Sequence, residues 1–179
     1  MTLVDRCKSI ELLLLDVDGV LTDGAIVYGG NGLELKSFHV RDGSGIKVWR
    51  QAGKKAAILS GRSSPAVLVR AKELDIEPVI QGAASKMAGY QQILAASGII
   101  PEQVCVIGDD IADLPLFYNC GLAVAVADAC PDVIANVHYV TRAAGGRGAV
   151  REVIEMILGC QNQWQSVVTR LANESLSAS

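Results

Sequence analysis

The stretch LLLLDVDG, residues 12–19, places a heavily apolar segment directly before two carboxylates. Four consecutive leucines indicate a strand that is covered on both faces, because a half-exposed strand alternates apolar and polar residues. Asp16 and Asp18 follow at once, and such close carboxylates repel each other unless a cation lies between them. In an extended chain, side chains two residues apart point the same way. The stretch therefore predicts a buried strand that ends in a reactive or cation-binding site.

Further apolar runs of strand length follow along the chain and alternate with helical patterns. Together with residues 10–18, they lie at 55–60, 77–81, 103–110, 122–128 and 137–141. Ser64-Pro65 and Ser85 are typical helix starts, and an apolar stripe over 150–158 indicates a later helix. This alternation predicts an α/β fold, namely a single Rossmann-like three-layer domain with a parallel central sheet.

One segment interrupts the alternation. In residues 24–38, two short β-prone runs flank the glycine-rich stretch 29–32, which predicts a β-hairpin inserted after the first strand. Beyond residue 160 the patterning weakens, so residues 161–179 are predicted to form a frayed helix or tail. We therefore expect one domain over residues 1–160.

Composition excludes several classes of protein. The net charge of −3 over 179 residues is not the basic balance of a nucleic-acid-binding protein. No run is apolar for long enough to span a membrane, and the N-terminus lacks the features of a signal peptide. The five cysteines lack C-x-x-C spacing, which favours reduced thiols over a disulfide framework or a zinc site. The sequence predicts a cytoplasmic protein that binds neither nucleic acid nor membranes.

Polar side chains follow four of the predicted strands. Because open α/β sheets bind ligands at the carboxyl ends of their strands, we expect these side chains to share one pocket. In chain order, they are Asp16, Asp18, Ser60, Arg62, Lys86, Asp109, Asp110 and Asp113.

The chemistry of this set points to phosphoryl transfer. Clustered carboxylates without histidine or cysteine suit Mg²⁺, which binds one or two carboxylates together with a phosphate. Lys86 at a helix N-terminus is suited to bind that phosphate, and Ser60 adds a hydrogen-bond donor. Asp16, at the strand end, is the candidate nucleophile for an aspartyl-phosphate. Asp18 is the candidate acid and base.

The motifs that carry these residues resemble a known family. DVDGVLTDG, LSGR, the single Lys86 and GDDIADLP, in that order, resemble the four motifs of the haloacid dehalogenase-like phosphatases. Further segments, including SGRSSPAVLVRAKEL and YVTRAAGGRGAVREV, narrow the resemblance to the 3-deoxy-D-manno-octulosonate 8-phosphate phosphatases. This resemblance extends from about residue 10 to residue 160 and implies release of phosphate from a sugar acid in lipopolysaccharide precursor biosynthesis.

The resemblance implies the same roles for the nucleophile, the acid/base and the phosphate-binding residues Ser60 and Lys86. It adds Mg²⁺ ligands, which are the carboxylates of Asp16 and Asp109 and the backbone carbonyl of Asp18. Two more carboxylates have supporting roles. Asp113 is expected to position Lys86 or a metal-bound water, and Asp110 to act through water.

Neither the 19–59 nor the 61–85 segment is long enough to hold the cap domain found in most relatives. The resemblance implies that the subfamily forms homotetramers in which neighbouring subunits cover each other's sites. We expect residues 24–38 and the loop around Arg147 to make these contacts, with Arg147 meeting the substrate carboxylate. Arg62 and Arg70 are further candidate substrate-binding residues.

Two alternatives remain open at this point. Relatives on the same scaffold act on a nine-carbon, sialic-acid-type 9-phosphate, although the Arg62 and Arg70 pattern favours the octulosonate substrate. A non-enzymatic phospho-receiver domain also combines carboxylates, a hydroxyl and a lysine. A receiver, however, carries its phospho-acceptor after a middle strand and lacks an acid/base such as Asp18 two residues later.

Overall fold

A six-stranded parallel sheet forms the centre of the molecule, as the sequence predicts. The computed structural model describes the fold of residues 1–177 and the side chains of residues 1–173. The strand order is β5-β4-β1-β6-β7-β8. The strands are β1 (Leu12–Leu15), β4 (Lys55–Leu59), β5 (Val79–Ile80), β6 (Val104–Gly108), β7 (Leu122–Ala125) and β8 (Tyr139–Val140). Strand β1 pairs with β4 on one side and with β6 on the other, so the opening leucine run lies at the centre of the sheet.

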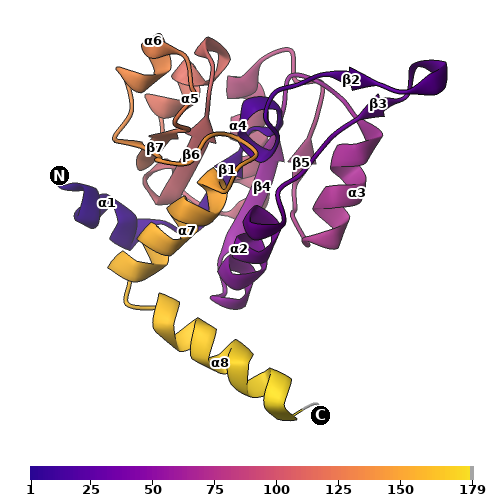
Figure 1. Ribbon diagram of the computed structural model, residues 1–179. Coiled ribbons are helices and arrows are strands. Elements are labelled where there is room, and N and C mark those ends of the chain that lie inside the picture. Colours follow the sequence, from indigo (N-terminus) through magenta and orange to yellow (C-terminus); the bar gives the residue numbers. More distant parts are fainter. Residues whose placement is uncertain (178–179) are drawn as a thin grey trace.

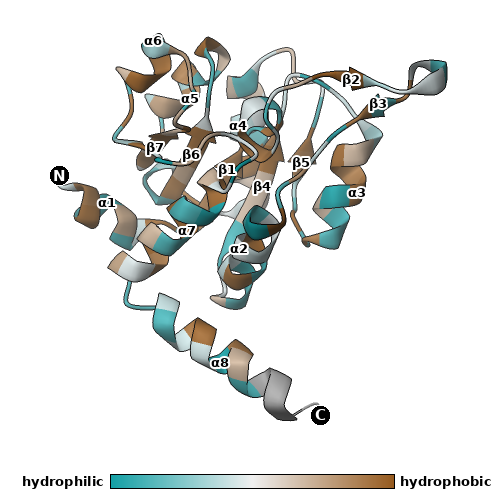
Figure 2. Ribbon diagram, in the orientation of Figure 1, coloured by the Kyte–Doolittle hydropathy of each residue, from teal (hydrophilic) through white to brown (hydrophobic). Residues whose placement is uncertain are grey.

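Helices cover both faces of this sheet, which gives the predicted three layers. The helices are α1 (Leu3–Ser9), α2 (Val40–Gln51), α3 (Pro65–Glu73), α4 (Lys86–Ser97), α5 (Leu114–Phe117), α6 (Pro131–Ile134), α7 (Ala149–Cys160) and α8 (Trp164–Ser177), the last of which packs on α7 and α2. Helices α2 and α7 pack against each other in front of the sheet in Figure 1, whereas α4 lies behind it. Figure 2 shows apolar residues concentrated on the strands and polar residues on the outer helix surfaces.

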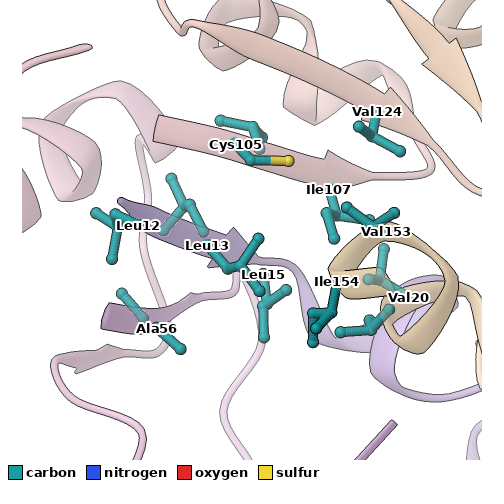
Figure 3. Packing of buried hydrophobic residues seen from close by; sticks show 14 of the residues in the cluster. Leu12, Leu13, Leu15, Val20, Ala56, Cys105, Ile107, Val124, Val153 and Ile154 are labelled. Atoms are coloured by element: carbon teal, nitrogen blue, oxygen red, sulfur yellow. The ribbon is translucent and has the colours of Figure 1, made fainter. Parts of the chain in front are cut away.

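The core is built around β1. Leu12, Leu13 and Leu15 are fully buried, and Leu14 is 1% exposed. Figure 3 shows Ile107 of β6 beside the α7 residues Val153 and Ile154, close to the turn that follows β1. Complete burial of a leucine side chain stabilises a fold by about 1.5–3 kcal/mol. This packing fixes the point at which the chain leaves β1 and enters the site.

The predicted hairpin is present and extends away from the sheet (Figure 1). Strands β2 (Val27–Tyr28) and β3 (Glu34–Leu35) are antiparallel, and a 3₁₀ turn over Gly30–Gly32 joins them. Asn31 in this turn has a φ of 60°, a conformation that asparagine tolerates better than most residues. The hairpin and α2 occupy the chain between the turn after β1 and β4, and the described residues of this segment form no cap domain.

Helix α8 occupies Trp164–Ser177, within the segment that the sequence predicts as a frayed helix or tail. Helix α8 follows α7 closely, and Val167 is 4% exposed against the core. The Arg151 guanidinium lies 4.7 Å from the centre of the Trp164 ring, and Arg170 Nη2 donates to the Gln51 carbonyl at 2.5 Å. Within residues 1–177, no helix has both the length and the apolarity needed to cross a bilayer.

Candidate active site

The residues that follow the strands gather at one edge of the sheet. They line a cavity of about 340 Å³, together with neighbouring glycine and alanine positions. The predicted residues on its wall are Asp16, Asp18, Ser60, Arg62, Lys86, Asp109 and Asp110. The parallel arrangement of β1, β4 and β6 therefore brings together side chains that are up to 94 positions apart in the sequence (Asp16 and Asp110).

Asp16 stands at the end of β1 and is held from two sides. Its Oδ1 accepts a hydrogen bond from the Val17 amide at 2.7 Å, and its Oδ2 accepts one from Lys86 Nζ at 2.7 Å. Its backbone amide donates to the carbonyl of Ile107, which ties the residue to β6. Asp16 is thus oriented before any ligand binds.

Lys86 lies between two carboxylates. It is the first residue of α4, whose N-cap Ser85 accepts a hydrogen bond from the Ala88 amide. Its Nζ is 2.7 Å from Asp16 Oδ2 and 2.5 Å from Asp113 Oδ1. Burial lowers the pKa of Lys86, but the two carboxylates more than offset this, and its pKa lies above the ordinary value. Lys86 therefore remains a cation at the cavity wall.

The acidic motif after β6 contains three carboxylates, of which Asp109 and Asp110 line the cavity. Asp113 is buried, and its Oδ2 accepts from the backbone amides of Asp109 and Asp110 at 3.2 and 3.4 Å. Its other oxygen, Oδ1, contacts Lys86 Nζ, and the role of Asp113 in positioning Lys86 stays a prediction. Asp110 caps the short helix that follows, accepting from the Ile111 amide at 2.8 Å, while it also lines the cavity.

The turn after β1 brings Asp109 close to the backbone. Gly19 has a φ of 88°, and a Cβ on this residue would lie 2.0 Å from Asp109 Oδ2. On the other side of the turn, a Cβ on Gly145 would lie 1.7 Å from the Gly19 carbonyl oxygen. Glycine is required at both positions because two chain segments meet here without room for a side chain.

The carboxylates of this site suit a cation. Asp109 Oδ1 is buried and has no hydrogen-bond partner. Oxygen atoms of Asp16, Asp109 and Asp113 lie within 4.8 Å of one another. Burial raises the pKa of Asp109 to about 7, helped by the neighbouring carboxylates, and burial raises the pKa of Asp16 to about 6 against the effect of Lys86. A hard divalent cation bound by these oxygens would stabilise their ionised forms.

Asp18 points toward the hairpin. One carboxylate oxygen is bonded to Lys36 Nζ, and the other lies 3.4 Å from Arg62 Nε. Both cations also bind Glu34, Lys36 at 3.0 Å and Arg62 at 2.7 Å. Lys36 of the hairpin segment 24–38 thus contacts Asp18 of its own chain, and the expected contact of this segment with a neighbouring subunit stays a prediction.

Ser60 is 3% exposed at the end of β4, and its Oγ accepts from the Arg62 amide at 3.2 Å. The two remaining predicted arginines lie outside the cavity in a single copy of the chain. Arg70 is on α3, where it pairs with Glu73 at 3.0 Å and lies 5.8 Å from the Phe38 ring centre. Arg147 lies 3.2 Å from Asp23. Their proposed contacts with substrate remain predictions.

The patterns in the sequence did not identify Glu34 and Lys36 as residues of the site. A signal is present, because Glu34 and Lys36 flank Leu35 with the two-residue period of a strand. The sequence of a two-residue strand, however, does not show which of its two faces is turned toward the site. Only the contact with Asp18 and Arg62, far away in sequence, distinguishes them.

Comparison with known proteins confirms the family resemblance that the sequence motifs indicate. Residues 77–154 match the haloacid dehalogenase-like hydrolase family. The chain is 46% identical to the 3-deoxy-D-manno-octulosonate 8-phosphate phosphatase KdsC of Yersinia pestis over 160 residues, 89% of this chain and 86% of that protein.

Two solved structures that resemble this chain belong to the same family of phosphatases. The crystal structure of the 3-deoxy-D-manno-octulosonate 8-phosphate phosphatase from Yersinia pestis superposes with a TM-score of 0.89, covering 90% of this chain and 88% of the other at 46% identity. The corresponding phosphatase from Moraxella catarrhalis, in complex with a magnesium ion, a phosphate ion and KDO, superposes with a TM-score of 0.90 at 39% identity. It covers 94% of this chain and 97% of the other.

Proposed function

Since the chain belongs to the 3-deoxy-D-manno-octulosonate 8-phosphate phosphatases of the haloacid dehalogenase-like hydrolases, we propose that it releases phosphate from that sugar acid phosphate in lipopolysaccharide precursor biosynthesis. The observation that carries this proposal is the arrangement of charges around Asp16. Lys86 bridges Asp16 and Asp113, and the unpartnered oxygen of Asp109 lies alongside. A carboxylate nucleophile, a fixed cation and an incomplete ligand set are what phosphoryl transfer to aspartate requires.

In the first step, Asp16 attacks phosphorus. The bond from phosphorus to the sugar oxygen breaks, a bond to the Asp16 carboxylate forms, and Asp18 gives its proton to the departing oxygen. Lys86 and Ser60 bind the phosphoryl oxygens, and the positive charge of Lys86 stabilises the transition state. In the second step, Asp18 takes a proton from water, which attacks the aspartyl-phosphate and releases phosphate and free Asp16.

We propose Mg²⁺ as the cofactor, held by the carboxylates of Asp16 and Asp109 and by the backbone carbonyl of Asp18. When bound, this ion neutralises phosphate charge during transfer. The orphaned Asp109 oxygen and the all-oxygen ligand set support the choice, as does the magnesium ion in the Moraxella catarrhalis relative.

The substrate is assigned by similarity and by charge. The Moraxella catarrhalis structure contains KDO beside phosphate, and the present cavity has Arg62 at its wall as a partner for a carboxylate. In this proposal, Arg70 and Arg147 complete the sugar-acid site only when subunits assemble, because both lie outside the cavity of one chain.

The proposed assembly is a homotetramer whose contacts involve the hairpin. The apolar side chains of the hairpin are exposed in the single chain, with Val27 at 50%, Leu33 at 59% and Leu35 at 48%. Phe38 and Val69 border an adjoining groove of about 460 Å³. An exposed apolar surface of this kind supports an interface. Full activity of a monomer in sedimentation experiments at low concentration would contradict this proposal.

A substrate panel tests the proposed activity. Phosphate release is measured from 3-deoxy-D-manno-octulosonate 8-phosphate and from a nine-carbon, sialic-acid-type 9-phosphate, each with Mg²⁺ and with EDTA. We expect a higher kcat/KM for the eight-carbon substrate and loss of turnover in EDTA. A higher kcat/KM for the nine-carbon substrate would overturn the substrate assignment, and phosphate release from neither substrate would overturn the proposed activity.

A further inference from the structure

We infer that Lys36 is a positioning residue that holds the Asp18 side chain in place for proton transfer to the leaving oxygen, a role that rests on the proposed function. Lys36 follows β3 directly and lies outside the motifs that supply the predicted catalytic residues. It acts through Asp18 and not on the substrate.

Four charged side chains form a closed ring at this point. Lys36 contacts Asp18 and Glu34, and Arg62 contacts the same two carboxylates from the other side. When Asp18 is ionised, as it is between giving its proton to the leaving oxygen and taking one from water, each carboxylate of the ring has two cationic neighbours and each cation has two carboxylate neighbours. Such a ring restricts Asp18 more tightly than a single ion pair does, because rotation of its carboxylate weakens two contacts at once.

The two cations of the ring differ in how firmly they are held. The Lys36 side chain is only 2% exposed, whereas the Arg62 side chain is 45% exposed. Exposed ion pairs are worth little, since water competes for both partners and the side chains lose entropy. Lys36 is consequently the fixed member of the ring, and Arg62 is the one that a substrate can engage.

The strand pattern explains how Lys36 reaches its position. Glu34 and Lys36 face the site, while Leu35 between them is exposed on the opposite side. Leu35 is paired across the hairpin with Val27, which is also exposed. The hairpin thus has a charged inner side that contacts Asp18 and an apolar outer side.

Proton transfer depends on the position of Asp18. A general acid works only within hydrogen-bond reach of the oxygen that it protonates, and a misplacement of about 1 Å costs on the order of 100-fold in rate. Loss of Lys36 leaves Asp18 with Arg62 alone, at 3.4 Å. The loss of rate expected without Lys36 depends on the leaving group, because a sugar alkoxide needs a proton when it departs and a nitrophenolate does not.

The test compares Lys36→Met with Lys36→Arg, and uses Lys72→Met on the exposed surface of α3 as the matched control. For each variant, kcat/KM is measured with the octulosonate 8-phosphate and with p-nitrophenyl phosphate, since this ratio reports the first transfer step. We expect Lys36→Met to lower kcat/KM about 100-fold for the sugar phosphate and less than about 3-fold for the nitrophenyl ester. Lys36→Arg restores much of the loss, and Lys72→Met changes neither value.

An equal loss with both substrates, with KM unchanged and the melting temperature lowered, would assign Lys36 a purely structural role and overturn the inference. A second measurement does not depend on turnover. Crystal structures of Lys36→Met and of the unmodified protein are compared, and we expect the Asp18 carboxylate to leave its position in the variant. An Asp18 that stays in place overturns the inference even if the sugar phosphate is not the substrate, whereas failure of the unmodified protein to turn over that substrate overturns only the proposed function.

Discussion

Lys86 shows at the scale of one residue how charge organises this site. Its side chain is 9% exposed and lies between Asp16 and Asp113, so its removal leaves two buried carboxylates without their shared cation. Breaking a buried ion pair in this way costs about 3–5 kcal/mol of folding free energy. In the proposed function Lys86 also binds the phosphoryl group, so loss of its charge is expected to lower kcat about 100- to 1000-fold.

We therefore expect Lys86→Met to lower both the free energy of unfolding, measured by urea titration in EDTA, and the rate of phosphate release. Lys47→Met, at an exposed position of α2, is the control and changes neither quantity. A Lys86→Met variant of unchanged activity would show that Lys86 does not bind the phosphoryl group.

The raised pKa values of Asp16 and Asp109 predict how pH affects the site. Without a cation, both pKa values, about 6 and about 7, lie above the ordinary value of 3.8. Folding then favours the protonated carboxyls, so the stability that they contribute is present below pH 4 and is lost as the pH rises to about 7. Mg²⁺ must displace these protons, and its binding strengthens over the range from about pH 5 to pH 7.

Melting temperatures measured with EDTA and with Mg²⁺ between pH 5 and pH 8 test this expectation. The increase caused by Mg²⁺ is small at pH 5 and reaches a plateau above pH 7. In Asp109→Asn the increase is largely lost at every pH. A stabilisation by Mg²⁺ that does not vary with pH would contradict the assignment of these carboxylates as ligands.

At the scale of elements, the turn between β1 and the hairpin controls where Asp109 lies. Gly19→Ala introduces a Cβ 2.0 Å from Asp109 Oδ2, at a φ of 88° that alanine rarely adopts. We expect this variant to weaken Mg²⁺ binding, measured by calorimetry, at least about 10-fold, because a shift of 1.4 kcal/mol already has that effect. The control is Gly159→Ala in α7, which meets no other atom within 4 Å and leaves Mg²⁺ binding unchanged.

The regular elements could be predicted because their signals are local. Continuous apolar runs identified all six strands of the sheet, and caps such as Ser85 identified helix starts. Helix α1 was not predicted, since its seven residues carry only a capping box at Thr2 and one buried side chain, Cys7. Short helices of this kind depend on tertiary packing more than on their own sequence.

The candidate site could be predicted in part. Each strand end could be read from the sequence, and parallel topology then placed Asp16, Lys86 and Asp109 together. The positions of Lys36 and Glu34 in the site could not be predicted, because their partners Asp18 and Arg62 are distant in sequence and become neighbours only in the folded chain.

At the scale of the whole molecule, the exposed outer side of the hairpin predicts a requirement for assembly. We expect Val27→Ser combined with Leu35→Ser to shift the proposed tetramer toward smaller species in sedimentation velocity, without lowering the melting temperature of the dissociated chain. Val4→Ser on α1, 47% exposed, is the control and leaves the assembly intact. A double variant that sediments like the unmodified protein would exclude the hairpin from the interface.

The central claim is that Asp16 carries the phosphoryl group between substrate and water. Rapid-quench analysis with 3-deoxy-D-manno-octulosonate 8-phosphate labelled at phosphorus tests it most directly, with Asp16→Asn as the matched variant. We predict a hydroxylamine-sensitive label on the peptide containing Asp16 that forms with Mg²⁺, decays as phosphate appears, and is absent from Asp16→Asn. Phosphate release without a labelled protein, or a label on a different residue, would contradict this account.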